Sequence, residues 1–202
     1  MQINKEYMVG TDTSHHNPEF YRNMGCWDFE IHKLTEGTSF ISSTVERWWN
    51  DRKHEKKLSG VYHMLNEKNV QAQVDFALSK FTEMKMVGRA IFIVDYELPE
   101  IKPESSAGVF QLKQFVREVK NATNGKWQPF VYCNKSCRKA IMNITDEWRH
   151  WCLWLADYQE VETIYSDGWN PIMRQWTTCG DKLDINMFYG SEGSWESLIL
   201  RG

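Results

Sequence analysis

The sequence of 202 residues lacks any long apolar segment. Its purely apolar runs are short, such as that of residues 90–94, whereas a membrane-spanning helix needs about 20 such residues. The first ten residues, MQINKEYMVG, contain neither a basic start nor an apolar run of the length found in signal peptides. We therefore expect no membrane partner and no secretion signal.

An excess of positive charge is also absent, because 24 lysine and arginine residues stand against 27 aspartate and glutamate residues, which gives a net charge of -3. Proteins that bind nucleic acid normally carry a basic surface that attracts the phosphate backbone. The composition therefore predicts no nucleic-acid partner.

Cysteine is scarce, and no two cysteines form a CxxC pair; the five are Cys26, Cys133, Cys137, Cys152 and Cys179. This odd set does not require a disulfide framework. A zinc site built from Cys133, Cys137, His150 and Cys152 would not have a regular ligand spacing. We interpret the cysteines as reduced and mostly buried, and we expect no metal site.

Aromatic residues are abundant, with ten tryptophans among them. Indole rings are hard to bury completely and often line grooves, where their flat faces suit sugars.

Short β-branched or aromatic runs alternate with helical stretches in the first two thirds of the chain, which is typical of βαβ units. The clearest helical stripes lie in residues 70–87 and 110–119, and weaker helices are expected in 44–58 and 135–148. After residue 153 we expect only strands and loops. The predicted fold is an α/β, TIM-like β/α barrel of eight strands with reduced helices after strand five, (β/α)5(β)3, in a single domain over residues 1–202. The expected strands cover residues 7–12, 29–34, 60–65, 90–97, 129–134, 153–158, 173–176 and 183–188.

Carboxylates recur at or near the ends of five of these strands, where a β/α barrel presents its reactive groups. They are Asp12, Glu36, Asp95 with Glu97, Asp157 and Asp184. Gathering so many acids at one rim costs repulsion and desolvation, which favours a functional explanation.

Asp95 and Glu97 are two residues apart on an expected strand, so their side chains point to one face with Cα atoms about 6.6 Å apart. Crowding should raise the proton affinity of one of them and give an acid beside a carboxylate, the pair that glycoside cleavage requires. The alternative is that Asp-Tyr-Glu only begins a solvated loop.

The order of motifs along nearly the whole chain resembles the glycoside hydrolase family 25 lysozymes, or Chalaropsis-type muramidases. The matching segments are VGTDTSHHN, FEIHKLTEG, GVYHML, FIVDYEL, PFVYCN, LWLADY, MRQWT and LDINMFYG. The resemblance implies hydrolysis of the β-1,4 bond between N-acetylmuramic acid and N-acetylglucosamine in peptidoglycan. It also implies a barrel with reduced helices near its end.

The same resemblance implies roles for the acids. Glu97 would be the proton donor and later the base, and Asp95 would be the nucleophile or the residue that steadies the substrate's own 2-acetamido group. Asp12 and Asp184 would hold the sugar and tune protonation. Neither a metal nor an organic cofactor is expected, because proton transfer and charge stabilisation suffice for this bond.

Several polar and aromatic residues at the strand ends are expected to bind the glycan, although barrel packing is the ordinary explanation for any single ring. These candidates are Tyr62, Tyr132, Trp154, Asp157, Gln175 and Trp176. Lys33 and Glu36 are expected to pair at the rim or to be solvated, outside the catalytic set.

Two other functions remain open at this point. A chitinase-like hydrolase also uses an Asp-x-Glu strand, but residues 89–97, RAIFIVDYE, lack the longer acidic pattern of that class. A non-catalytic glycan-binding or virion protein could keep the same barrel. We expect a monomeric endolysin that binds peptidoglycan glycan strands. It would be made in the bacterial cytoplasm and reach the wall through a holin-type pore or as a virion component.

Overall fold

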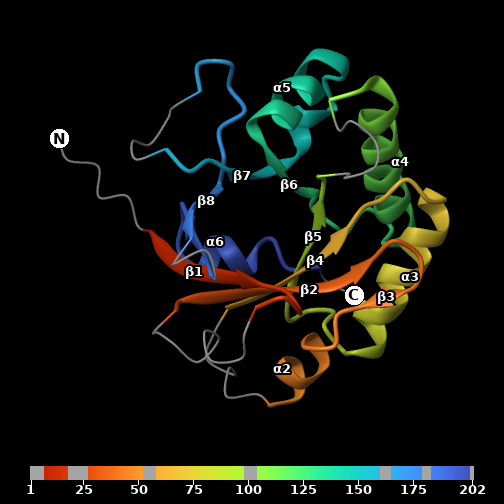
Figure 1. Cartoon of the computed structure of the whole chain (residues 1–202), viewed down its shortest axis with the longest axis vertical. Coiled ribbons are helices and arrows are strands. Elements are labelled where there is room, and N and C mark those ends of the chain that lie inside the picture. The colour runs from red at the N-terminus through yellow and green to blue at the C-terminus, as the bar shows by residue number, and fades with distance from the viewer. Residues whose placement is uncertain are drawn as a thin grey trace.

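The computed structural model describes residues 7–17, 27–51, 58–97, 104–159, 165–178 and 183–200. Eight strands form the central barrel (Figure 1). They are β1 (Met8–Thr13), β2 (Phe29–Glu36), β4 (Leu58–Met64), β5 (Ile91–Asp95), β6 (Phe130–Asn134), β7 (Cys152–Ala156), β8 (Met173–Thr178) and β9 (Asp184–Phe188). A two-residue strand, β3 (Phe40–Ile41), pairs with the end of β2.

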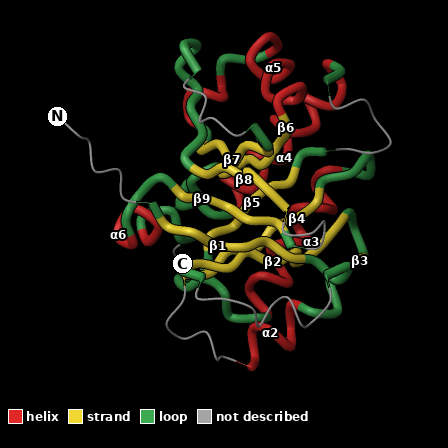
Figure 2. The backbone as a smooth tube through the Cα atoms, turned by 60° about the vertical axis from the view of Figure 1, so that its left-hand side comes forward, coloured by secondary structure: helices red, strands yellow, loops and turns green. Residues whose placement is uncertain are grey.

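The sheet closes because β1 pairs with β2 on one side and with β9 on the other. Between them the order runs β9-β8-β7-β6-β5-β4-β2, so every barrel strand has two neighbours (Figure 2). All neighbouring pairs are parallel except those of β9, which is antiparallel to both β1 and β8. The expected closed barrel of eight strands is therefore confirmed, with its last strand reversed.

Helices cover the outer faces of the early strands (Figure 1). They are α2 (Val45–Asp51), α3 (Val70–Glu83), α4 (Ser106–Ala122) and α5 (Lys135–Ile144), followed by a 3-10 turn at Glu147–His150. The predicted stripe of α4 is buried against the barrel, including Leu112, Phe115, Val116 and Val119. Within the described residues, no helix is long and apolar enough to cross a membrane.

One expected helix and two expected strands end earlier than predicted. Helix α3 stops at Glu83 rather than 87, and the chain then turns through Lys85 and Gly88, which have positive φ. Strand β5 ends at Asp95 and β7 at Ala156, so Glu97 and Tyr158 lie just beyond their strands. A short helix, α6 (Glu192–Glu196), follows β9 where we expected only strand and loop.

The barrel interior is apolar at the end where the parallel strands begin and polar where they finish. Side chains such as Phe29, Ile31, Ile91 and Met173 fill the apolar part. Gly10 makes room for this packing, because a Cβ there would lie 2.4 Å from the Phe29 ring. The polar side chains are thus confined to one end of the barrel.

Trp195 of α6 plugs the apolar end. Its ring is fully buried and lies 4.7 Å from Phe29 and 5.2 Å from Phe188, measured between ring centroids. Its indole nitrogen has no hydrogen-bond partner. The short helix therefore contributes a large aromatic side chain to the barrel core.

Replacing Trp195 by Ala should lower the free energy of unfolding by about 3–5 kcal/mol, because it leaves a cavity among aromatic rings. Trp195→Phe should cost much less, since it keeps most of the apolar volume and removes an unpaired N–H. Urea unfolding followed by circular dichroism measures both. An equal loss of unfolding free energy in the two variants would contradict the packing role of the Trp195 ring.

Candidate active site

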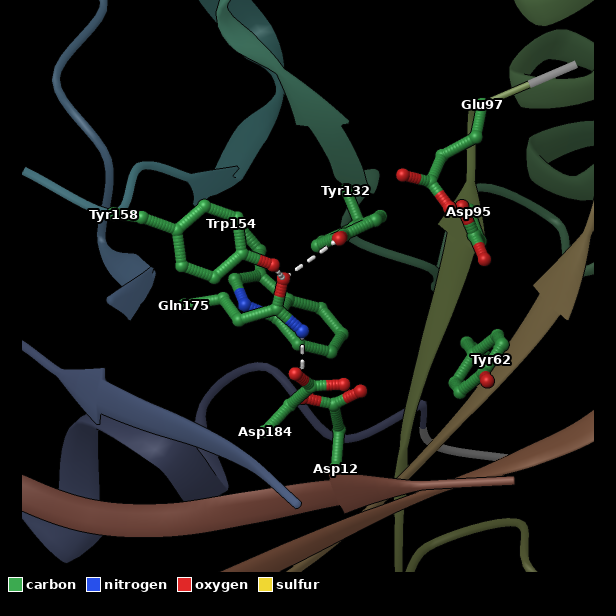
Figure 3. A pocket seen from close by; sticks show the side chains of 9 residues that line it. All are labelled: Asp12, Tyr62, Asp95, Glu97, Tyr132, Trp154, Tyr158, Gln175 and Asp184. Carbon is green, nitrogen blue, oxygen red and sulfur yellow. Dashed lines mark hydrogen bonds between the residues drawn. The ribbon is translucent and has the colours of Figure 1, made fainter. Parts of the chain in front are cut away.

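A cavity of about 260 Å³ opens at the polar end of the barrel. Residues from seven strands or the loops directly after them line it (Figure 3). The lining residues are Asp12, Tyr62, Asp95, Glu97, Tyr132, Trp154, Tyr158, Gln175 and Asp184. All four residues expected to be catalytic therefore share one cavity, together with four of the six expected glycan contacts.

Asp184 reaches this cavity because β9 runs backwards. The residue begins its strand, and the start of an antiparallel strand lies beside the ends of its neighbours. Asp184 is the register partner of Asp12 on β1. Facing residues in such a pair have side chains on the same face, so the two carboxyls lie together in Figure 3.

Asp12 is the most heavily hydrogen-bonded acid of the site. Its Oδ1 accepts from the side-chain amides of Asn186, at 2.7 Å, and Gln175, at 3.0 Å. Burial, with the nearby charge of Asp184, raises the pKa of Asp12 to about 7 despite these bonds. Burial also raises the pKa of Asp184. One proton shared across this pair would relieve the repulsion at neutral pH.

Asp95 and Glu97 approach the cavity from the opposite side (Figure 3). Asp95 is only 7% exposed, and its Oδ1 has no hydrogen-bond partner. Burial and the charge of Glu97 raise the pKa of Asp95 well above its usual range. Glu97 is exposed, and its pKa is raised by partial burial and by Asp184. The two acids thus occupy unlike environments, one buried and one open.

Lys33 supplies positive charge next to these acids. Its ammonium is nearly buried and donates to Glu36 Oε2 at 2.5 Å. The charge of Lys33 lowers the pKa of both Asp95 and Glu97, opposing the effect of burial. Of the two alternatives left open by the sequence, pairing or solvation, the structure shows that Lys33 pairs with Glu36.

Gln175 joins Asp12 to two tyrosines of the cavity in one hydrogen-bond network. Its Oε1 accepts from the hydroxyls of Tyr132, at 2.8 Å, and Tyr158, at 2.6 Å, while its Nε2 donates to Asp12. Trp154 donates to Asn186, the second donor to Asp12. The aromatic wall and the acid are therefore held in one fixed arrangement.

Tyr158 is the cavity residue that our sequence reasoning missed, and Asp157 and Trp176 lie elsewhere. Asp157 forms an ion pair with Lys135 at 2.7 Å and does not line the cavity. Trp176 is 38% exposed and is also absent from the lining. Alternation along the strands is the signal that could have corrected these assignments, because residues two apart point to the same face and adjacent residues to opposite faces. If Trp154 points into the barrel, so does Tyr158. If Gln175 points into the barrel, Trp176 points away from the cavity.

Most tryptophans serve packing rather than sugar binding. Trp154 is the one that lines the cavity, whereas six others are buried in the core: Trp48, Trp127, Trp148, Trp151, Trp169 and Trp195. Of the cysteines, Cys133 and Cys137 are free and buried, and Cys152 is free and half-buried. Cys26 and Cys179 lie outside the described residues.

Fold and site together define a class: a β/α barrel with unlike carboxyls around an open polar cavity has the arrangement of a glycosidase. A family model, Glycosyl hydrolases family 25, matches residues 11–185. The chain belongs to this family and is a glycoside hydrolase of the lysozyme type, which confirms the resemblance seen in the sequence.

Solved structures of similar fold cover nearly the whole chain. A muramidase from Trichobolus zukalii has a TM-score of 0.76 and 21% identity, covering 95% of this chain and 98% of its own. A GH25 lysozyme from Aspergillus fumigatus has a TM-score of 0.75 and 21% identity, covering 98% and 100%. The Clostridium perfringens spore cortex lytic enzyme SleM has a TM-score of 0.76 and 14% identity, covering 96% and 71%. No curated protein matches the sequence.

Replacing Asp12 by Asn should change the pH dependence of stability. The pKa of Asp12 is about 7 in the folded chain against an ordinary value of 3.8, so its stabilising contribution is full below about pH 4 and is lost as the pH rises to about 7. We expect Asp12→Asn to raise the free energy of unfolding at pH 8 by about 1–3 kcal/mol relative to wild type. The gain should shrink towards pH 4.

Thermal or urea unfolding at pH 4 and pH 8 measures this difference. Asn keeps an oxygen that can accept from Gln175 and Asn186, so the hydrogen bonds are preserved. The same difference between variant and wild type at both pH values would contradict a buried, proton-binding Asp12.

Proposed function

We propose that this chain hydrolyses the β-1,4 bond between N-acetylmuramic acid and N-acetylglucosamine in peptidoglycan. The observation that carries the proposal is the unlike pair Asp95 and Glu97 in the wall of one open cavity. Glycoside cleavage needs one protonated carboxylic acid and one carboxylate beside the same glycosidic bond. Unequal burial provides this, because it gives the two groups different pKa values.

Glu97 is the general acid that protonates the leaving oxygen and later the base that activates water. Before substrate binds, the deeper burial of Asp95 favours a proton on this residue. A bound sugar changes this balance, because its acetamido N–H can donate to the Oδ1 of Asp95, which has no partner. That bond favours the carboxylate of Asp95 and leaves the proton on Glu97.

Asp95 then steadies the substrate's acetamido group as the latter attacks the anomeric carbon, or acts itself as the nucleophile. Either route gives retention of configuration. Asp12 and Asp184 hold the sugar from the opposite side, with Tyr62, Tyr132, Trp154 and Gln175 as the remaining contacts. Lys33 opposes the rise in the pKa of Asp95 and Glu97, which favours their ionised forms.

We further propose that residues 1–202 form one catalytic domain that acts as a monomer and needs no cofactor. An endolysin, CTP1L, has a TM-score of 0.62 and 20% identity over 92% of this chain, which concerns the fold alone. Release from a host bacterium through a holin-type pore, or delivery by a virion, stays a prediction of the sequence.

Glu97→Gln should reduce the rate of bacterial wall clearing by at least about 100-fold, because Gln keeps the shape and cannot deliver a proton. Glu83→Gln is the matched control, since Glu83 is 59% exposed at the last turn of α3 and away from the cavity. Turbidity loss of purified walls measures the rate. A Glu97→Gln variant as fast as wild type would refute the assignment of the acid.

Purified walls and N-acetylglucosamine oligomers should distinguish the candidate functions. We expect reducing ends to be released from walls and few from the oligomers, as measured by chromatography. Faster cleavage of the oligomers would favour the chitinase-like alternative. Binding of either glycan without cleavage would favour a non-catalytic protein.

A further inference from the structure

Tyr158 has an unusual place at the cavity. It lies beyond the end of β7, its side chain is 56% exposed, and its hydroxyl donates to Gln175 Oε1 at 2.6 Å. Figure 3 shows its ring beside Trp154 and over Gln175. Because more than half of the residue is exposed, the bonds made by the backbone on either side of Tyr158 matter for where its ring lies.

Arg174 provides that restraint on both sides of Tyr158. Its Nε donates to the backbone carbonyl of Asp157 at 2.7 Å, and its second guanidinium nitrogen donates to the carbonyl of Gln159. These carbonyls belong to the residues directly before and after Tyr158. The guanidinium itself is only 6% exposed, so water competes little for these bonds.

We call the two bonds from Arg174 to the carbonyls of Asp157 and Gln159 the clamp, and the other bonds of Asp157 strengthen it. Its backbone N–H donates to the carbonyl of Gln175 at 2.9 Å, and its carboxylate lies 3.8 Å from Arg174 and 2.7 Å from Lys135. Tyr165 also donates to this carboxylate at 3.2 Å. The carboxylate of Asp157, which we expected to touch sugar, is thus bonded to Lys135 and Tyr165 of the protein itself.

Strand β8 thus holds Tyr158 from two faces. Arg174 and Gln175 are consecutive, so their side chains leave the strand on opposite sides. Arg174 fixes the backbone of the loop outside the barrel, and Gln175 binds the hydroxyl inside it.

We propose that Arg174, supported by Asp157, is a positioning residue that keeps Tyr158 as one wall of the glycan-binding cavity. The planar guanidinium can bind two carbonyls at once, whereas the single ammonium of lysine cannot hold both in the same geometry. Loss of the clamp frees the Tyr158 ring and weakens glycan binding while leaving the four acids in place. This inference rests on the proposed function only for the identity of the glycan.

Kinetics on soluble peptidoglycan fragments test the coupling. Arg174→Lys keeps the charge opposite Asp157 and should fold, yet it should raise KM about tenfold with little change in kcat. In a Tyr158→Ala background the same substitution should change KM by less than about twofold, because the residue on which Arg174 acts is gone. An equal change in KM in both backgrounds, or a fall in kcat alone, would overturn the proposal.

Arg138→Lys is the matched control. Arg138 is also buried, and it binds Asp167 and the carbonyl of Trp169 in the same connection between β7 and β8. Its substitution should lower the melting temperature much as Arg174→Lys does, with no change in KM. A matching rise in KM would mean that general loosening of the connection explains the effect, which also overturns the proposal.

Nitration of tyrosine by tetranitromethane gives a readout that needs no glycan. Burial and the nearby acids raise the pKa of Tyr158 to about 12, which keeps little of the reactive phenolate at pH 8. A freed ring moves towards the ordinary pKa of about 10, so Arg174→Lys should speed its nitration at least about tenfold. Mass spectrometry of peptides locates the modified residue.

Half-buried Tyr62 and buried Tyr132 serve as internal references, and Arg138→Lys should leave the nitration rate of Tyr158 unchanged. An unchanged rate in Arg174→Lys would refute the clamp even if the wild-type protein cleaves walls. A faster rate in a protein that cleaves no wall would support the clamp and refute the proposed function instead.

Discussion

The buried carboxylate of Asp12 is the point on which the polar end of this barrel depends. It receives hydrogen bonds from β8, through Gln175, and from β9, through Asn186, and it faces Asp184 across the β1–β9 pairing. Gln175 carries the connection on to Tyr132 and Tyr158. An acid in such a position costs stability unless its donors stay in place, so the aromatic wall and the acid constrain one another.

The separation of the barrel into an apolar and a polar half explains how the fold tolerates these acids. Aromatic and aliphatic side chains fill the half where the parallel strands begin, and Trp195 closes it. Repulsion among the carboxylates is therefore confined to a region where they can share protons and contact solvent. The apolar half supplies the stability that the acidic half removes, as is common in enzymes whose sites are strained.

Much of the fold could be predicted from the sequence, because apolar runs and helical stripes mark individual strands and helices. The stripes at Leu112 and Phe115 and the run before Asp95 depend on local periodicity, which a single sequence contains. The direction of β9 could not be predicted in this way. A parallel and an antiparallel strand have the same local sequence pattern. The sequence therefore indicates Asp184 at the rim but not the reversal of β9 that brings it there.

The site was harder to predict wherever it depended on which face a residue occupies. Asp157 and Trp176 were chosen for their chemistry, although alternation from Trp154 and Gln175 points them away from the cavity. Glu97 and Tyr158 lie beyond the ends of β5 and β7, yet both continue the alternation of their strands and line the cavity. The partners of Asp157 could not be predicted at all, because Arg174 and Lys135 meet it only after the chain has folded.

The closing of the barrel by its two most distant strands also has a consequence for synthesis. Asp12 is translated more than 170 residues before Asp184 and Asn186. A nascent chain that still lacks β9 has an open sheet, and its Asp12 lacks one of its two amide donors. The cavity is therefore completed only after β9 has been synthesised, which ties assembly of the site to the translation of this one strand.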